Sequence, residues 1–520
     1  MASYSTASHS GPHMTTRHLF TAFSQRSGTP TRNGPVLEAL SIREVIDRIF
    51  SFLSPTVSGL EDAVLQGSRY RAPTEGATLR SAALTCRTFR EPALDSLWKT
   101  MDTPFPFASP LLSPSPNSNF DFGIFSMPPE AFQRNLSRVR TFIYNVPEAN
   151  FLGHINVFLA IAAVQPALLP RLRTLIIPDF DSCLSLSSFH FSLISPSISS
   201  IDIGGIKSGE GYESFMSALC FRAQNSLKDI NCRSDQLPAA VFALPHLQSL
   251  CLEKLAPNIE PLVKRLASLS DLRSVDLKLA AFQLDAHDVT FPRLEDIRLS
   301  GTFPWITHFL RSCQTPYLQS LSLFFDPFSL EPRRCYGGDL TDIFSAMRMH
   351  PAWRHTLTTL RVSPIICPDY AQFFRSLADF PLTTLHATSH VTLPPSIRLS
   401  LTDIARHLPN IEILHIPPYR RGEEPPFSQL IELARLRPNL RELGTAVKSR
   451  VFGSPKSINH NLESLYVYGS SIGDPWAVSE QLDGIFPYLK HVKPSSGSEY
   501  ERDWVQVESL LKFCQRARRR

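Results

Sequence analysis

LRTLII, at residues 172–177, places apolar side chains at its first, fourth and sixth positions. The same pattern returns along the rest of the chain, often after a proline. Further copies are ISSIDI at 198–203, LKDINC at 227–232, LQSLCL at 247–252, LRSVDL at 272–277, LEDIRL at 294–299, LQSLSL at 318–323, LTTLRV at 357–362, LTTLHA at 382–387, IEILHI at 411–416, LRELGT at 440–445 and LESLYV at 462–467. VRTFIY at 139–144 reads as a first copy and LKHVKP at 489–494 as a degenerate last one. A pattern that recurs in this way predicts a repeat architecture.

The spacing of the copies indicates which repeat is present. From Leu172 to Leu489 the mean spacing is about 26 residues, within the leucine-rich range, although single spacings run from 20 to 39. In each copy the apolar positions alternate as a short strand requires, and helical patterns such as 261–269, 306–313 and 401–408 fill the gaps. The sequence therefore predicts an α/β leucine-rich-repeat solenoid, a horseshoe whose parallel strands line a concave binding face.

Three amphipathic helices are predicted before the repeats. Residues 41–53 place a continuous apolar stripe on one helical face, and Ser41 with Glu44 fits a capping box. A second stripe joins Leu79, Ala82, Ala83, Cys86 and Phe89. A third helix is expected to begin at Pro92 and to carry Leu94, Leu97, Trp98 and Met101. A bundle this small usually needs a partner to cover its apolar surface.

Two stretches of this region carry a family resemblance. LSIREVIDRIFSFLSP at 40–55 and TLRSAALTCRTFREPALDSLWKTM at 78–101 resemble the F-box motif of fungal F-box proteins, in which irregular leucine-rich repeats commonly follow. Arg43 stands where that family often has proline, and the insertion at 54–77 is longer than in a minimal F-box.

The resemblance implies that the helices bind the SKP adaptor of an SCF-type cullin-RING ubiquitin ligase, while the repeats hold a protein substrate. On this carry-over, the residues that supply the F-box core and the adaptor surface are Leu40, Ile42, Ile46, Ile49, Phe50, Leu53, Leu84, Leu94, Leu97 and Trp98. The alternative is a plain helical cap for the first repeat, because solenoid ends need capping.

The domain organisation follows from these patterns. Residues 1–36 form a mobile N-terminal segment rich in Ser, Thr, Pro and Gly, and residues 37–101 form the F-box. Residues 102–135 form a Pro, Ser and Phe-rich linker, and residues 136–520 form the repeat domain. A last amphipathic helix is expected to cap the solenoid with Trp504, Val507, Leu511 and Cys514.

The outward strand positions supply the candidate substrate contacts. These residues are Asp229, Asn231, Arg233, Asp276, Lys278, Asp296, Arg298, Arg361, Tyr466 and Tyr468. Tyr and Arg are the types that most often anchor interfaces. The alternative for each single residue is a solvated polar face without a dominant contact.

Catalytic and cofactor motifs are not found. GGIKSGEG at 204–211 lacks the order of a phosphate-binding loop, and no GxSxG elbow occurs. The pairs His350 with His355 and His386 with His390 come without an HExxH or Cys/His ligand pattern. We therefore expect a protein that is not an enzyme, with no catalytic residue, metal or cofactor.

The composition limits the partners and the cellular compartment that we expect. The 52 Lys and Arg against 47 Asp and Glu leave a net charge of only +5, so we expect neither nucleic acid nor a membrane as a partner. Nine cysteines without a CxxC pair, and an N-terminus without the apolar core of a secretion signal, predict a cytoplasmic or nuclear protein. Two rival functions remain open: an interaction scaffold with no role in ubiquitination, and a regulator of a small GTPase.

Overall fold

The computed structural model describes residues 43–52, 73–101, 129–144, 167–180, 191–206, 210–233, 237–253, 260–279, 289–325, 339–363, 370–388, 400–416, 424–448, 458–495 and 497–519. These residues fall into two compact units, 1–98 and 99–520. The predicted mobile segment at 1–36 and most of the predicted linker lie outside the described residues. Within the described ranges, no helix combines the length and the apolar character needed to cross a bilayer.

The described residues of the first unit, 43–52 and 73–98, form three helices. They are α3 (Arg43–Ser51), α5 (Pro73–Thr85) and α6 (Arg87–Trp98). Ile46 and Phe50 on α3 pack with Leu79 and Ala82 on α5 and with Ala93 on α6 to form its apolar core. Burying such side chains contributes roughly 1.5–3 kcal/mol each, so this small core holds the three helices together.

The boundary between the second and third helices differs from the prediction. α5 ends at Thr85, and α6 begins at Arg87, so Phe89 lies on α6 and Pro92 lies inside that helix instead of opening it. Phe89 explains the earlier start, because its ring packs edge-on against Phe50 with 5.9 Å between ring centroids and so draws the first turn of α6 onto the core. A proline at this position removes one helical hydrogen bond and crowds the carbonyl four residues earlier, so the packing of Phe89 must outweigh this cost.

The second unit is built on one long parallel sheet. In the part of the chain that the structure describes, its fifteen strands follow one another in sequence order, interrupted only by β8 and β10. The strands are β1 (Thr100–Met101), β2 (Thr141–Ile143), β3 (Thr174–Ile177), β4 (Ser200–Ile203), β5 (Asp229–Cys232), β6 (Ser249–Leu252), β7 (Ser274–Lys278), β9 (Asp296–Gly301), β11 (Ser320–Phe325), β12 (Thr359–Ser363), β13 (Thr384–Ala387), β14 (Ile413–His415), β15 (Glu442–Thr445), β16 (Ser464–Val467) and β17 (His491–Pro494).

Each copy of the repeated pattern supplies one of these strands, which confirms the predicted parallel strands. The third position of the pattern begins the strand, and the same positions pair from strand to strand, as in Leu175 with Ile201 and Ile201 with Ile230. The first, fourth and sixth positions are buried; Leu172, Leu175 and Ile177 are each 0% exposed. This alternation makes one side of the sheet the core of the solenoid.

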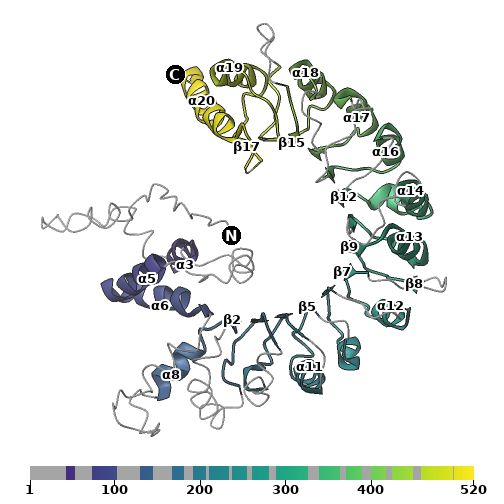
Figure 1. Cartoon of the computed structure of the whole chain (residues 1–520). Coiled ribbons are helices and arrows are strands. Elements are labelled where there is room, and N and C mark those ends of the chain that lie inside the picture. Colours follow the sequence, from purple (N-terminus) through teal and green to yellow (C-terminus); the bar gives the residue numbers. More distant parts are fainter. Residues whose placement is uncertain are drawn as a thin grey trace, which may run out of the picture. The chain divides into compact units, whose positions relative to one another are not determined.

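Helices connect the strands on the buried side of the sheet (Figure 1). They are α8 (Pro129–Leu136), α11 (Glu210–Arg222), the 3₁₀ helix η4 (Ala239–Ala243), α12 (Glu260–Ala267), α13 (Phe303–Ser312), α14 (Asp339–Arg348), α15 (Trp353–Thr356), α16 (Tyr370–Leu377), α17 (Leu401–His407), α18 (Phe427–Leu436), α19 (Pro475–Ile485) and α20 (Glu501–Arg519). The three expected helices at 261–269, 306–313 and 401–408 correspond to α12, α13 and α17. Strands on one side and helices on the other give the unit the fold of a leucine-rich-repeat solenoid.

The sheet begins before the predicted repeat domain. Thr100 and Met101 form β1, which pairs with Thr141 and Phe142, so Met101 does not belong to the third helix as predicted. There was little indication of this strand in the sequence, because β1 has only two residues and lacks the full repeat pattern. In addition, α8 lies inside the segment predicted as linker, and β8 (Val289–Thr290) pairs with β10 (Cys313–Gln314) in a small second sheet that was not predicted.

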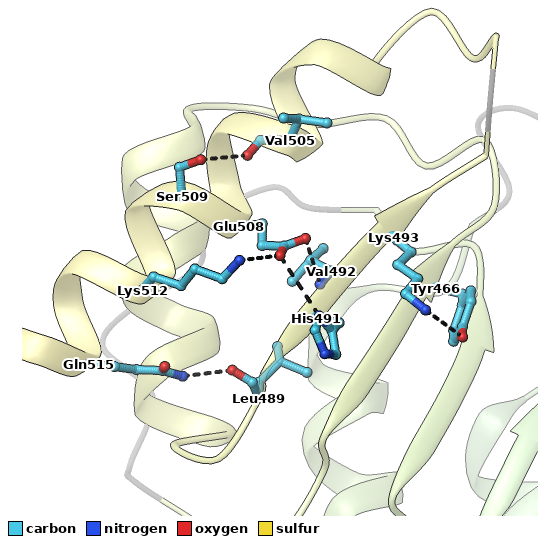
Figure 2. Close-up of polar contacts among 10 residues, drawn as sticks. All are labelled: Tyr466, Leu489, His491, Val492, Lys493, Val505, Glu508, Ser509, Lys512 and Gln515. Atoms are coloured by element: carbon cyan, nitrogen blue, oxygen red, sulfur yellow. Dashed lines mark hydrogen bonds and ion pairs between the residues drawn. The ribbon is translucent and has the colours of Figure 1, made fainter. Parts of the chain in front are cut away.

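The final helix covers the last strand, as the sequence predicts. On α20, Trp504, Val507 and Leu511 are at most 1% exposed. Glu508 accepts hydrogen bonds from the Val492 backbone amide and from Lys512, and Gln515 donates to the Leu489 carbonyl at 2.8 Å (Figure 2). The helix therefore closes the free edge of the sheet with side chains in place of another strand.

Candidate functional site

The predicted adaptor residues separate into buried and exposed groups. Ile46 and Phe50 are 2% and 6% exposed and belong to the core of the helical unit. Ile49 and Leu84 are 44% and 87% exposed. Leu94, Leu97 and Trp98 are half-buried on α6, whereas Leu40, Ile42 and Leu53 lie outside the described residues.

α3 presents a second apolar stripe on its outer side. Val45, Ile49 and Phe52 are 36%, 44% and 76% exposed, and their spacing of four and three residues places them along one face. Ile46 and Phe50 point to the core from the same helix. α3 is therefore apolar on two faces although the helices described cover only one of them.

The concave face of the repeat unit is formed by the third, fifth and seventh positions of the pattern. Strand pairing aligns the fifth positions into a single row that crosses the sheet, here called the fifth-position row. From β4 to β17 it contains Asp202, Asn231, Cys251, Asp276, Arg298, Ser322, Arg361, His386, His415, Gly444, Tyr466 and Lys493. Five of the predicted substrate contacts therefore lie in one continuous line.

The amino-terminal part of this face pairs its charges internally. Arg233 lies 3.3 Å from Glu253, and Arg298 lies 3.4 Å from Asp276 while its guanidinium stacks 4.5 Å from the Phe324 ring centroid. The carboxylates of Glu253 and Asp276 on neighbouring strands neutralise these two cations, which leaves them only partly available to a ligand.

The carboxyls of this part are held at unusual pKa values. Burial raises the pKa of Asp229, Asp276 and Asp296, and nearby cations oppose the rise, with Arg298 acting on both Asp276 and Asp296. Cys251 stands next to Asp276 in the fifth-position row, and burial together with the neighbouring carboxylates raises the pKa of its thiol to about 12. A thiol with that pKa is a poor nucleophile.

A network centred on His415 occupies the carboxyl-terminal part. The Nε2 atom of His415 lies 2.7 Å from the Glu442 Oε1 atom, and its Nδ1 atom contacts the Tyr468 hydroxyl. Because a carboxylate only accepts, Nε2 carries the proton, and the Tyr468 hydroxyl donates to Nδ1. Both nitrogens of His415 are therefore occupied within the protein.

Aromatic rings extend this network along the row. His386 stacks on His415 with ring centroids 4.5 Å apart and an angle of 26° between the rings, and Tyr466 lies 4.8 Å from His415 on the other side. Lys493 follows, with its Nζ atom 3.1 Å from the Tyr466 hydroxyl and 4.9 Å from the ring centroid. We call His386, His415 and Tyr466 the ring platform.

Gly444 makes this arrangement possible. It stands in β15 between His415 and Tyr466, and a Cβ atom at this position would lie 2.4 Å from His415 Nδ1 and 2.7 Å from the Tyr468 hydroxyl oxygen. Any side chain here would push the imidazole and the phenol apart. The glycine is needed for the space it leaves and not for its backbone freedom.

The two histidines of the platform are neutral near pH 7. Burial, the neighbouring His415 and Arg361 lower the pKa of His386 to about 4. Burial also lowers the pKa of His415, although its hydrogen bond to Glu442 works in the opposite direction. Burial, with Tyr466 and Glu442, raises the pKa of Tyr468 to about 12, so its phenol stays protonated.

Sequence reasoning found Arg361, Tyr466 and Tyr468 in this region but missed His386, His415, Glu442, Gly444 and Lys493. Four of these stand at the fifth position of their copies, and Glu442 stands at the third. Comparing the third position and the fifth position through every copy of the pattern would have found these five residues. Among the described residues, no three His, Cys, Asp or Glu side chains are arranged to hold a metal ion.

No protein-family model matches the sequence, and a search of curated proteins finds no match. Among solved structures, the chain is similar to an internalin, InlF, from Listeria monocytogenes, at 12% identity and a TM-score of 0.30, over 72% of this chain and 91% of that one. It is also similar to a chain of the Rad7 and Elc1 complex in yeast, at 14% identity and a TM-score of 0.34, over 68% of this chain and 86% of that one. Scores this low assign no function.

Proposed function

We propose that this chain is the substrate-recognition subunit of an SCF-type cullin-RING ubiquitin ligase, whose helical unit binds the SKP adaptor and whose repeat unit holds a protein substrate. The observation that carries the proposal is the apolar surface left open on the helical unit, at Val45 and Ile49 of α3, at Phe52 directly after it and at Leu84 of α5. Exposed apolar groups of this kind mark interaction sites in soluble proteins.

The exposed set is distinct from the residues that hold the unit together. Ile46, Phe50 and Leu79 fill the core, so Ile49 and Leu84 are not required for packing. Val45, Ile49 and Phe52 lie together on one side and are not scattered single residues, and an exposed apolar patch of this kind is expected to serve a partner. The F-box resemblance of this segment names the SKP adaptor as that partner.

The proposed role is one of binding alone. On the concave face the Glu442, His415 and Tyr468 chain resembles a nucleophile with its base, but the hydrogen bonds run within the protein and the pKa of Tyr468 is about 12. A phenol with a raised pKa is not an activated nucleophile. This network supports a structural and recognition role for the face.

The test is binding of the full chain to a purified SKP adaptor, measured by biolayer interferometry. Ile49→Asp with Leu84→Asp should weaken binding at least about tenfold, because two charges would enter a desolvated apolar contact. Phe221→Asp is the matched control, since Phe221 on α11 is 79% exposed and lies in the repeat unit. It should bind the adaptor like the unmodified chain.

The controls make a negative result decisive. Hydrogen exchange over α3, α5 and α6 in each variant shows whether the helical unit is folded. If the folded, unmodified chain does not bind the adaptor, the ligase role is rejected, and a leucine-rich-repeat interaction scaffold remains. Equal binding by the double variant and the control would move the adaptor contact away from α3 and α5.

A further inference from the structure

We infer that the concave face from β12 to β17 binds an extended acidic peptide segment, whose carboxylates pair with Arg361 and Lys493 and whose central apolar side chain packs on the ring platform. The inference rests on the proposed function in one respect, since the segment would belong to the substrate. The repeat unit carries all the contacts, so the site can be tested independently of adaptor binding.

Neither cation at the ends of the platform forms an ion pair with a described carboxylate, although Asp296 lies near enough to Arg361, and Glu442 and Glu508 near enough to Lys493, to interact electrostatically. Arg361 is exposed and makes no ion pair with any residue that the structure describes. Lys493 is also exposed, and its contacts are the hydroxyl and the ring of Tyr466 instead of a carboxylate. By contrast, Arg233 and Arg298 on the same face are each within 3.4 Å of a carboxylate. Arg361 and Lys493 therefore have charge available for a ligand.

Acidic groups are scarce in this part of the face. At the outward positions described for β12 to β17, Glu442 is the one carboxylate, and His415 holds it at 2.7 Å. From β5 to β9 the same positions carry four acids, Asp229, Glu253, Asp276 and Asp296. The same positions from β5 to β9 also carry three cations, Arg233, Lys278 and Arg298, so the net charge there is −1, against +1 from β12 to β17. This difference in net charge favours the carboxyl-terminal part as the place where an acidic segment binds.

The ring platform suits the middle of such a segment. His386, His415 and Tyr466 stand side by side across β13 to β16, with neighbouring centroids 4.5 and 4.8 Å apart. Gly444 leaves no side chain standing above them in β15. His386 makes no hydrogen bond to a described residue, so its ring nitrogens are available to a peptide backbone. His415 is only 5% exposed and both of its nitrogens are bonded, so His386 and Tyr466 supply the open ring surface of the platform. Partly exposed aromatic rings with a polar group are effective interface anchors.

The spacing of the cations sets the length of the ligand. Arg361 in β12 and Lys493 in β17 are five strand positions apart in the sheet order. At about 4.8 Å per strand this is roughly 24 Å, which an extended peptide covers in about seven residues. The preferred ligand therefore has acidic residues about seven positions apart with an apolar residue between them.

Cations and rings together also bind single-stranded nucleic acid in some proteins. The observations favour a peptide, because only two cations without an ion pair flank the platform and the β5 to β9 region carries four carboxylates against three cations. A phosphate backbone running along the face would find no net positive charge in that region. Single-stranded RNA is therefore included as a competing probe.

The experiment uses the full chain and a fluorescent peptide of about eleven residues, with two glutamates about seven positions apart and a central tryptophan. Fluorescence anisotropy measures its binding, beside a peptide with lysines in place of the glutamates and an oligouridine of similar length. The acidic peptide should bind and the lysine peptide should not. Arg361→Glu with Lys493→Glu should weaken binding about tenfold or more.

Lys278→Glu is the matched control. Lys278 is an exposed cation on the same face in β7, it makes no ion pair with a described residue, and it lies outside the ring platform. Its reversal should change affinity by less than about twofold. Tyr466→Ala should weaken binding by removing part of the platform while leaving both cations in place.

Several results would overturn the inference. They are equal affinity for the acidic and lysine peptides, no saturable binding up to the order of 1 mM, tighter binding of the oligouridine, or equal effects of the double reversal and of Lys278→Glu. Adaptor binding is measured on the same preparations. A chain that binds the adaptor but not the peptide loses this inference alone, and a chain that binds the peptide but not the adaptor loses only the ligase role.

Discussion

The carboxylate of Glu508 accepts a hydrogen bond from the backbone amide of Val492 at 3.3 Å. Val492 belongs to β17, the last strand of the sheet, and Glu508 belongs to the helix that covers it (Figure 2). A free strand edge is a template for pairing with other chains. Here a side chain takes the place of the next strand, and the sheet ends at a defined point.

The burial of α20 gives a first prediction, for stability. Trp504→Ala should lower the free energy of unfolding by about 3–5 kcal/mol, because it removes a side chain that is 1% exposed and donates to the Ser470 carbonyl at 3.0 Å. Val505→Ala, at a neighbouring position that is 53% exposed, should cost less than about 0.5 kcal/mol. Urea unfolding followed by far-ultraviolet circular dichroism measures both. Similar losses in the two variants would mean that α20 does not pack on the sheet.

The helical unit offers a second prediction with a control on the same helix. Leu79 and Leu84 both lie on α5, but they are 0% and 87% exposed. Leu79→Ala should destabilise the unit by about 2–5 kcal/mol, whereas Leu84→Ala should have almost no effect on folding. Hydrogen exchange of α3, α5 and α6 in the full chain should be faster only in the Leu79 variant. Equal protection in the two variants would contradict the core assignment.

The sequence predicts much of the fold because the repeated pattern has a strict period. Every copy from Val139 to Leu489 supplies a strand, since its alternating apolar residues have only one side on which to be buried. The boundary between α5 and α6, which the sequence placed at Pro92 and the structure places between Thr85 and Arg87, was less predictable, because tertiary packing of Phe89 decides it. β1 escaped detection because two residues are too few to show an alternation.

The sequence could predict which residues of the candidate site face outward, but not which of their side chains contact one another. Arg361 and Tyr466 were found because their types are common in interfaces, whereas His386 was considered only as a metal ligand, an interpretation that the sequence did not support, and His415 was not considered. Their stacking depends on the parallel register of β13 and β14 and on the absence of a side chain at Gly444. The strand register determines which residues are neighbours on adjacent strands. A single sequence does not show which of these neighbours will form hydrogen bonds.

The role of Gly444 gives a third prediction. Gly444→Ala should destabilise the protein by about 1–3 kcal/mol, because its Cβ atom would meet the His415 ring at 2.4 Å. In a His415→Ala background the same substitution should cost less, since the imidazole is gone and only the Tyr468 hydroxyl, 2.7 Å from the added Cβ atom, remains in its way. A double-mutant cycle by urea unfolding measures this coupling. Additive effects would show that His415 does not occupy the space above Gly444.

The last prediction concerns pH. The pKa of His386 is about 4 in the folded chain, and an unfolded histidine has a pKa of about 6.5. Above about pH 6.5 both states are neutral and His386 adds no pH dependence. As the pH falls towards 4, the unfolded state binds a proton that the folded state does not, so the free energy of unfolding decreases. His415 acts in the same direction, because burial also lowers its pKa.

His386→Asn separates this effect from the rest of the molecule, because an amide does not titrate. Between about pH 7 and pH 5 the unmodified chain should lose more unfolding free energy than the variant, measured by urea unfolding at each pH. Nuclear magnetic resonance of histidine-labelled protein should show His386 titrating well below the usual range. A His386 that titrates near 6.5, with equal pH dependence in both proteins, would mean that its ring is solvated and that the stack on His415 does not form.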